Sequence, residues 1–501
     1  MSSAILSQTP TGADPLPVSG WRRIVDSPAA PIVLLAAFAG LIAWTINRFS
    51  IWIDESGTLL VVGRNGYVDI IHRVAVDVHP PLWYLVLKPW LQLFGNTLIA
   101  ARAQSGVFML AALGVWYHFV RTRFSRPLAV LTLALAVTNP MLLHYAVEAR
   151  MYAFGVLLTA ASCVFLTGTA RWRWFAYWLC AVAMLYVHYF LAFPIAGQFV
   201  FLLLRSRQLR LSWLWIVVYG ASIVAAFATW LPHAFHQTAD VLARGFWIGP
   251  VAPSSVVAFV LHTFLHRVDS DLQGRLVFPG LAYLAMWWAA LIRARRAHNG
   301  PHALLWSLIA VPLLCLFVVS CPPLRPVFHP RYAVFGVPAL ITLLAAGALG
   351  FTGRWRSIAV SVLLVGHLCG LRMLRYRGFN ETRGFWSMKQ IAKEVSAPID
   401  GELPWVVATW IFPFFDARAT LDMRQHVTIR VDSPPEFHTP GVVYYGHPDW
   451  YIFSWGEIHA RHVWVIDENG APPVEVPANW KLEVTHSRGY ARTRLFAIQT
   501  P

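Results

Sequence analysis

The stretch that decides the fold is "APIVLLAAFAGLIAWTINRFSIWIDESGTLL" (residues 30–60), where a long apolar run is followed by two adjacent carboxylates. A helix needs about 20 apolar residues to cross the hydrocarbon core of a bilayer. Residues 30–47 come close to that length, and they are too long for the apolar part of a cleavable signal peptide. We therefore predict an uncleaved membrane anchor, with Asp54 and Glu55 just beyond its outer end.

The composition of the whole chain supports this interpretation. Of the 501 residues, 57% are hydrophobic and only 13% are charged, and the mean hydropathy is +0.53. About a quarter of a typical soluble domain is charged. The net charge of +16 does not indicate a nucleic-acid partner, because the Arg residues punctuate apolar runs as they do in membrane proteins. We predict an all-α polytopic membrane bundle.

Eleven apolar segments are predicted to span the membrane. They are residues 30–47, 98–120, 127–144, 151–169, 174–190, 191–204, 212–231, 276–293, 302–321, 333–350 and 357–375. Two further apolar segments, residues 81–95 and 254–267, are expected to lie in the membrane interface as helices. The first of these is short and contains Lys88 and Pro89, which makes a crossing unfavourable.

The charges of the connections predict the topology. Five short loops carry thirteen Arg and no acid: residues 121–126, 171–173, 205–210, 293–298 and 354–356. The positive-inside rule places them in the cytoplasm. The acids between residues 54 and 375 all fall in other loops, and they are Asp54, Glu55, Asp69, Asp77, Glu148, Asp240, Asp269 and Asp271. The N-terminal tail (residues 1–29) is then cytoplasmic and the C-terminus extracytoplasmic.

The composition changes after the predicted transmembrane domain (residues 30–376), in which the first outer loop covers residues 48–97. Fourteen of the 24 acids lie in residues 381–501. Residues 382–395 have helical spacing. Short strands are predicted at residues 405–410, 426–431, 441–445, 462–467 and 493–498. We expect residues 377–501 to form a small extracytoplasmic (periplasmic) α/β domain.

The outward loops gather acids, bases and aromatic residues. The candidate substrate-binding residues are His79, Glu148, Arg150, Tyr152, His188, Tyr189, Arg331 and Tyr332. Ionisable groups at a membrane boundary are costly, and they are kept mainly where they pair or act. A carboxylate can take a proton from a hydroxyl nucleophile, and Arg and His can hold a phosphate. Together these groups favour sugar transfer from a polyprenyl-phosphate carrier.

Two simpler interpretations stay open for parts of this set. His188 with Tyr189, and Arg331 with Tyr332, also fit an interfacial aromatic belt.

A metal site at His262, His266, Asp269 and Asp271 is only weakly indicated, because a lone Asp-x-Asp is common. No cofactor is firmly predicted, and a divalent metal is possible but not favoured. Cytosolic nucleotide-sugar chemistry is not supported, since no nucleotide-binding motif occurs.

Several motifs occur in the order seen in a known family. They are the acid pair 54–55, "HPPLWYL" (79–85) with "LFG" and Arg102, "EARMYAF" (148–154), "HYF" (188–190) and "HPRYAVFGVPAL" (329–340). Over residues 30–345 the chain resembles the bacterial C-type (GT-C) glycosyltransferases of family 39. These are related to the protein O-mannosyltransferases and the lipid A aminoarabinose transferase. The resemblance implies a helical bundle with a catalytic first outer loop, a polyprenyl-phosphate-linked sugar as donor, and inversion at the anomeric carbon.

The resemblance also implies roles for single residues. Asp54 matches the catalytic acid of the first outer loop, and Glu55 matches the acid often beside it. Arg150 and Arg331 match basic residues that face the donor phosphate. His79 stands where the aminoarabinose branch has a Lys.

Departures from that branch point to the wider group with "HPPL". Val78 replaces a Glu before the double proline, and Ser56, Gly57 and Thr58 follow the acid pair where one branch has an Arg.

The expected function is a glycosyltransferase in a bacterial inner membrane, with a glycan, lipid or protein as acceptor, membrane lipids as surroundings and no nucleic-acid partner. The alternatives are a transporter or lipid flippase, and a non-catalytic sugar-lipid-binding assembly protein.

Overall fold

The computed structural model divides the chain into two compact units. The first contains Met1–Trp44, Ile71–Val86 and Arg102–Tyr376, and the second contains Thr45–Ile70, Leu87–Ala101 and Arg377–Pro501. The described residues are 26–48, 53–244, 251, 284–295, 300–321, 326–377, 394–395, 397–402, 404–408, 427–430, 451–452, 455, 458, 460–468, 472–488 and 491–498.

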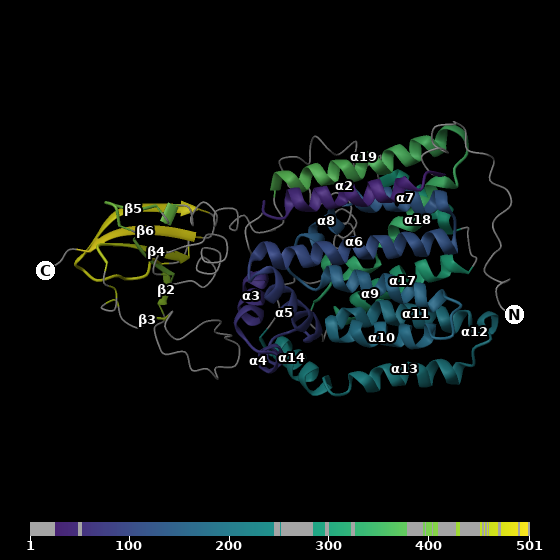
Figure 1. Cartoon of the computed structure of the whole chain (residues 1–501), viewed down its shortest axis with the longest axis horizontal. Helices are drawn as coiled ribbons and strands as arrows, with labels where there is room; N and C mark the ends of the chain where they lie inside the picture. Colours follow the sequence, from purple (N-terminus) through teal and green to yellow (C-terminus); the bar gives the residue numbers. More distant parts are fainter. Residues whose placement is uncertain are drawn as a thin grey trace. The chain divides into compact units, whose positions relative to one another are not determined.

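The first unit is a bundle of helices (Figure 1). Its elements are α2 (Ala29–Thr45), α6 (Leu98–Arg123), α7 (Arg126–Val137), α8 (Pro140–Ala146), α9 (Tyr152–Thr167), α10 (Arg173–Val187), η1 (Tyr189–Leu191), α11 (Ala192–Leu204), α12 (Ser206–Leu209), α13 (Trp213–Phe227), α14 (Leu231–Arg244), α17 (Pro301–Val319), η2 (Pro330–Gly336), α18 (Val337–Leu349) and α19 (Gly353–Arg377). The chain between α2 and α6 forms α3 (Ile53–Arg64), α4 (Tyr67–Ala75) and α5 (Leu82–Phe94). The segment predicted as an interfacial helix, residues 81–95, is thus helical as α5. The one predicted at 254–267 lies outside the described residues.

The count of eleven spans is not reproduced. Among the described residues, three helical stretches are long and apolar enough to cross a bilayer: α6, α17 and Pro330–Leu349. Two bent pairs qualify when each pair is taken together, α7 with α8 and α13 with α14. Four shorter apolar helices complete the set: Ala29–Thr45, Tyr152–Thr167, Arg173–Val187 and Tyr189–Leu204. Two predicted spans remain. Residues 357–375 lie within α19, which is not among these candidate spans. Residues 276–293 are described only from residue 284, and residues 284–295 are helical.

Two predicted spans contain or reach a break between helices. Residues 127–144 form α7 and α8, which are bent by 65° relative to each other. Residues 212–231 contain α13 and the first residue of α14, which is bent by 77° from α13. The first break follows from "TNP" at residues 138–140. Pro140 disfavours helical backbone in the residue before it, and Asn139 caps α8 by accepting a hydrogen bond from the backbone N–H of Leu142 at 3.0 Å.

Small residues let helices of the first unit approach closely. A side chain at Gly155 on α9 would lie 2.4 Å from Phe335, and one at Gly197 on α11 would lie 2.6 Å from the carbonyl oxygen of Ser307 on α17. Close backbone approach at small residues is how helices pack in membranes, where van der Waals contact replaces the hydrophobic effect. The same glycine at 155 brings Phe335 beside Tyr152, with ring centroids 6.4 Å apart.

A buried polar network joins α9, α10 and α11. The Tyr177 hydroxyl donates to Gln198 Oε1 at 2.9 Å, and Gln198 Nε2 donates to Ser162 Oγ at 2.6 Å. Ser162 Oγ in turn donates to the backbone carbonyl of Thr159 at 2.8 Å. Polar side chains among apolar helices need such partners, so the network fixes how these three helices sit against one another.

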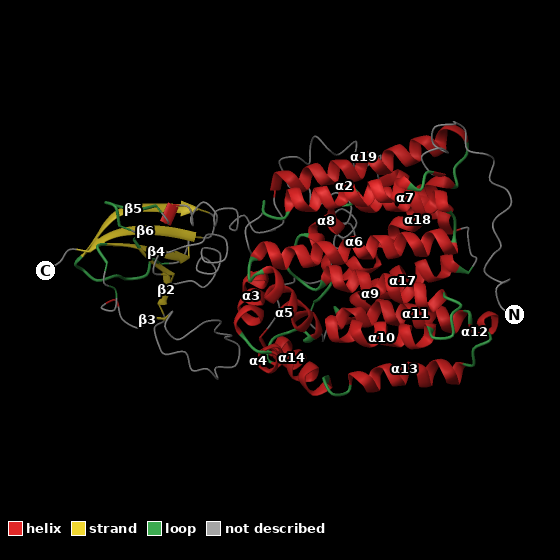
Figure 2. Ribbon diagram, in the orientation of Figure 1, coloured by secondary structure: helices red, strands yellow, loops and turns green. Residues whose placement is uncertain are grey.

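The strands lie in the second unit (Figure 2). They are β1 (Trp405–Ala408), β2 (Val427–Arg430), β3 (Tyr451–Ile452), β4 (His462–Glu468), β5 (Trp480–Arg488) and β6 (Ala491–Ile498). The order is β3-β2-β1-β4-β6-β5, with β3, β2, β1 and β4 parallel and β6 antiparallel to both β4 and β5. Four of the predicted strands are confirmed as β1, β2, β4 and β6, while the one at 441–445 and most of the helix at 382–395 lie outside the described residues.

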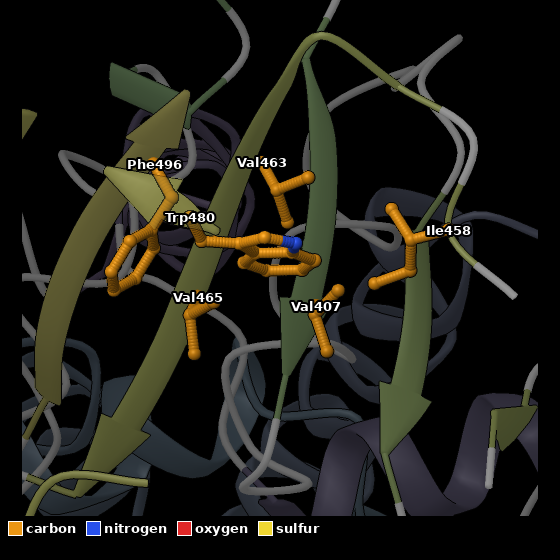
Figure 3. Close-up of a cluster of buried hydrophobic side chains, with 6 residues drawn as sticks. All are labelled: Val407, Ile458, Val463, Val465, Trp480 and Phe496. Carbon is orange, nitrogen blue, oxygen red and sulfur yellow. The ribbon is translucent and has the colours of Figure 1, made fainter. Parts of the chain in front are cut away.

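One face of this sheet carries an apolar core. Figure 3 shows Trp480 among Val407, Val463, Val465, Ile458 and Phe496. Near the other end of β4, buried Asp467 accepts from Arg492 Nε and from Arg494 Nη2, each at 2.6 Å. Both Arg residues are on β6, so this ion pair ties the parallel part of the sheet to its antiparallel edge.

Candidate functional site

Arg150, His79, Asp77 and Tyr84 form a closed ring of polar contacts, in which each side chain contacts the next. Arg150 Nη2 lies 3.2 Å from His79 Nε2, and His79 Nδ1 lies 3.6 Å from Asp77 Oδ2. The Tyr84 hydroxyl donates to the same Asp77 oxygen at 3.3 Å and accepts from Arg150 Nη1 at 3.5 Å. These residues come from the α4–α5 turn, from α5 and from the α8–α9 turn, so two segments of the first unit meet at Arg150.

The Asp77 carboxylate offsets positive charge in this ring. Burial alone would raise the pKa of the Asp77 carboxyl, but the hydrogen bond to His79 and the charges of His79 and Arg150 outweigh it, so the pKa is lowered. Asp77 is therefore a carboxylate at neutral pH, and it compensates the Arg150 guanidinium, whose side chain is buried at 4% exposure. A guanidinium has five N–H donors in a rigid fork, and two of its nitrogens face His79 and Tyr84.

His188 lies next to this ring, in the turn between α10 and η1. Its imidazole is 5.4 Å from that of His79, centroid to centroid. Aromatic rings enclose it from other elements: Tyr152 at 5.7 Å, Tyr332 at 5.7 Å, Phe335 at 5.9 Å and Phe190 at 5.4 Å. The predicted residues His79, Arg150, Tyr152, His188 and Tyr332 are thus brought together in one cluster, called the His188 cluster below.

Arg331 adjoins the same cluster from η2. Its backbone N–H donates to His329 Nδ1 at 3.3 Å, which caps η2 and fixes the start of "HPRY". Arg331 also acts electrostatically on His188, as His79 and Arg150 do.

Tyr189 points to a neighbouring polar chain rather than to the His188 cluster. Its hydroxyl donates to Gln237 Oε1 and accepts from Trp230 Nε1 at 2.9 Å. Gln237 Nε2 donates to the backbone carbonyl of Val74 at 2.8 Å. Tyr189 thus joins η1 to α14 and to the end of α4, which is a positioning contact.

Glu148 pairs within its own turn. Its carboxylate lies 3.1 Å from His144 Nε2, one helical turn earlier, and both side chains are largely buried. The backbone N–H of Arg150 donates to the carbonyl of Glu148 at 2.8 Å. This tight turn holds the start of the segment that presents Arg150.

The acid doublet begins α3, which belongs to the second unit. Glu55 is completely buried, and Asp54 is half-buried, with its backbone carbonyl accepting from Thr58 Oγ1 at 2.8 Å. In the same unit Lys88 Nζ donates to the carbonyl of Val62, 3.1 Å away, which ties α3 to α5. The doublet is thus at the beginning of a short helix, where carboxylates are favoured by the helix dipole.

Two residues of the ring, Asp77 and Tyr84, were not among the predicted site residues. Their signal was present in "DVHPPLWYL", because the double proline makes a sharp turn that brings Asp77 back toward the first turn of α5.

The weak metal candidates His262, His266, Asp269 and Asp271 lie outside the described residues. Within the described ranges, no three His, Cys, Asp or Glu side chains are grouped as a metal site.

Comparison with known proteins identifies the fold. A crystal structure of ArnT from Cupriavidus metallidurans bound to undecaprenyl phosphate matches 94% of this chain and 98% of its own, with a TM-score of 0.55 and 15% sequence identity. The chain has the fold of ArnT. This confirms the fold implied by the resemblance to C-type glycosyltransferases, and with the apolar helices it makes the protein an integral membrane protein.

Two further structures are similar at lower scores. ArnT from Cupriavidus metallidurans in the apo state matches 93% of this chain and 97% of its own with a TM-score of 0.44 and 12% identity. The Archaeoglobus fulgidus oligosaccharyltransferase in complex with Zn and sulfate matches 77% of this chain and 61% of its own, with a TM-score of 0.38 and 13% identity. No protein-family model and no curated protein sequence matches the chain.

Proposed function

We propose that this protein is a glycosyltransferase that moves a sugar from a polyprenyl-phosphate-linked donor to an acceptor hydroxyl at the outer face of the membrane. The observation that carries the proposal is the buried, compensated guanidinium of Arg150 in a chain with the fold of ArnT. A buried guanidinium held in a fixed orientation suits a phosphate, which it can bind in a forked, bidentate manner. The ArnT structure with this fold was bound to undecaprenyl phosphate.

The reaction we propose is a single displacement. Asp54 takes the proton of the acceptor hydroxyl, whose oxygen forms a bond to the anomeric carbon of the donor sugar. The bond from that carbon to the phosphate oxygen breaks, and polyprenyl phosphate leaves with the electron pair. Attack from the side opposite to the leaving group inverts the anomeric carbon.

Each group has a role in lowering the barrier. Arg150 and Arg331, with His79, neutralise the charge that grows on the departing phosphate, and such preorganised charge is commonly the largest contribution to catalysis. Glu55 orients the acceptor or the Asp54 carboxylate. The ring through Asp77 and Tyr84 keeps the Arg150 guanidinium in place, so no reorganisation is needed during reaction.

The proposal is tested by mass spectrometry of lipids and glycans from cells that carry or lack the gene. The expected result is one glycoconjugate whose sugar disappears with the gene and whose unsugared acceptor accumulates. The gene for the Asp54→Asn variant should not restore it, although the variant accumulates in the membrane as the wild type does. Solute or lipid movement with no missing sugar would instead support a transporter or flippase.

A further inference from the structure

His188 has two ring nitrogens with different environments. The backbone N–H of Phe190 donates to Nδ1 at 3.1 Å, which caps η1. A nitrogen that accepts a hydrogen bond carries no proton, so the proton of the neutral ring is on Nε2. The backbone of η1 therefore makes Nε2–H a hydrogen-bond donor and fixes its direction.

The Nε2–H group of His188 is buried and makes no hydrogen bond to the described part of the chain. His188 is only 3% exposed, and within the part of the chain that the structure describes Nε2 has no hydrogen-bond partner. Leaving a buried polar group unpaired is costly. In native proteins such a group commonly marks the place of a bound ion or ligand.

The charged neighbours of His188 indicate which charge a ligand at Nε2 would carry. The titratable and charged groups that face it are His79 with Asp77 behind it from the α4–α5 turn, Arg150 from the α8–α9 turn, Tyr152 from α9, and Arg331 and Tyr332 from η2. Two guanidinium groups are thus present, while Asp77 is turned toward His79 and Tyr84. A ligand oxygen that meets Nε2–H here is favoured if it is negatively charged.

We propose that His188 donates a hydrogen bond from Nε2 to an anionic oxygen of the donor's phosphate, and that it does so as a neutral imidazole. This inference rests on the proposed function, because it assigns a residue to the phosphate of the lipid-linked donor. A neutral donor keeps the same hydrogen bond over the physiological pH range, whereas a titrating imidazole would gain and lose charge.

The first test reads the tautomer directly. The full-length protein is labelled with ¹⁵N-histidine, reconstituted in lipid bilayers and studied by NMR, with the His188 signals assigned by their loss in the variants described next. Between pH 6 and 8 the ring should stay neutral, with Nδ1 unprotonated and Nε2 protonated. Undecaprenyl phosphate should shift the Nε2–H signal, whereas undecaprenol, which lacks the phosphate, should not. A cationic ring, or a proton on Nδ1, would overturn the proposal.

The second test uses a pair of variants that separate the two nitrogens. Asn in place of His188 can still accept from the Phe190 amide, as Asn does at helix caps, but it does not reach as far as Nε2. Gln carries an amide N–H to about the place of Nε2. His188→Asn should therefore weaken undecaprenyl phosphate binding roughly 10- to 100-fold, the usual effect of losing a hydrogen bond to a charged group. His188→Gln should recover most of that loss.

Controls separate this proposal from the proposed function. Inorganic phosphate tests whether the site takes the free ion or needs the lipid. Thermal unfolding of both variants without ligand checks that each is folded. If the wild type does not bind undecaprenyl phosphate, the proposed function fails and this inference fails with it. If the wild type binds and His188→Asn binds equally well, only the role of His188 is overturned.

Discussion

At the residue scale, the main feature is a guanidinium that is buried and yet fully supported. Arg150 is held by His79 and Tyr84, and both of these contact the Asp77 carboxylate. A buried charge is tolerated only when it is paired and hydrogen-bonded. The ring provides this pairing for Arg150.

Replacing Arg150 by Lys tests the forked geometry. Lys keeps the positive charge but is a point charge that cannot make two parallel hydrogen bonds. We expect kcat/KM for the lipid-linked donor to fall about 10²- to 10³-fold, the usual effect of removing one stabilising donor. The matched control is Arg121→Lys at the exposed end of α6, which should change the rate less than twofold. Equal rates in the two variants would exclude a phosphate-binding role for Arg150.

Asp54 is the residue on which the proposed chemistry depends. Asn is nearly the same size as Asp but cannot accept a proton, so Asp54→Asn should lower kcat by about 10²- to 10⁴-fold, the usual contribution of a general base. KM for the donor should change little, because Asp54 is proposed to act on the acceptor. The measurement is transfer of radiolabelled sugar by the purified protein in lipid. Full activity in this variant would remove Asp54 from the mechanism.

Asp77 predicts a dependence of stability on pH. Its pKa in the folded protein is lowered from the ordinary value of 3.8, so the ionised carboxylate stabilises the fold at pH values above the pKa of the unfolded chain. The contribution is lost as the pH falls through the lowered pKa. Asp77→Asn should therefore lower the free energy of unfolding by about 1.5–3 kcal/mol at pH 6–7. The difference in unfolding temperature between wild type and variant should shrink as the pH falls below 3.8 toward the lowered pKa, and a difference that is constant with pH would contradict the assignment.

The sequence predicted most members of the His188 cluster but not how they are supported. Charged residues at a membrane boundary stand out in an apolar chain, and this made Arg150, His188 and Arg331 visible. Asp77 was counted among the outward acids, yet nothing in its spacing indicated that it would reach Arg150 through His79. Such contacts depend on the angle of the turn at Pro80 and Pro81, and this angle cannot be predicted from the spacing of residues.

At the element scale, the breaks between helices position the site. His188 lies at the break between α10 and η1, and Arg150 lies in the turn between α8 and α9. Side chains at such ends can face a polar site while the helices remain apolar. Hydropathy alone treats residues 127–144 as one span, because it averages over Asn139 and Pro140.

Gly155 is the place where α9 makes room for the cluster. A methyl group there would lie 2.4 Å from Phe335 and 3.1 Å from Leu191, so Gly155→Ala should displace Phe335 and the rings around His188. We expect a loss of about 1–3 kcal/mol in stability from overpacking, with lower affinity for polyprenyl phosphate. The control is Gly114→Ala on α6, where the nearest side-chain atom is 4.0 Å away. That change should be neutral or stabilising, since Ala favours helix, and equal thermal shifts in both variants would contradict this account.

At the scale of the whole molecule, the fold was predicted better than the number of spans. Long apolar runs separated by Arg-rich loops define a polytopic bundle, and the ArnT structure confirms that architecture. The count of eleven is not confirmed, because several of the described helices are too short or too bent to qualify as spans on their own. In the second unit, the edge strand β5 was missed because its residues are largely exposed, with Leu482 at 50%, so it lacks the apolar alternation of a buried strand.

The sheet depends on the charge of Asp467. Removing the carboxylate by Asp467→Ala would leave Arg494 buried without its anion, which typically costs 3–5 kcal/mol. Hydrogen exchange of the backbone amides in β4 and β6 should speed up accordingly. Glu483→Gln serves as the control, because its contact with His462 is 3.8 Å long and partly exposed, and an exposed pair is worth about 0–1 kcal/mol. Unchanged exchange in Asp467→Ala would show that the strands do not need this ion pair.

The network around Gln198 has a consequence for how the protein is made. An amide that enters the bilayer alone is unfavourable, because its hydrogen bonds to water are lost. The side-chain partners of Gln198 are Tyr177, Ser162 and Cys163. All three precede it in the chain, so the ribosome delivers them first. When α11 leaves the insertion machinery, α9 and α10 already offer the acceptor and donor that its amide requires. The order of synthesis thereby matches the order in which these three helices can assemble.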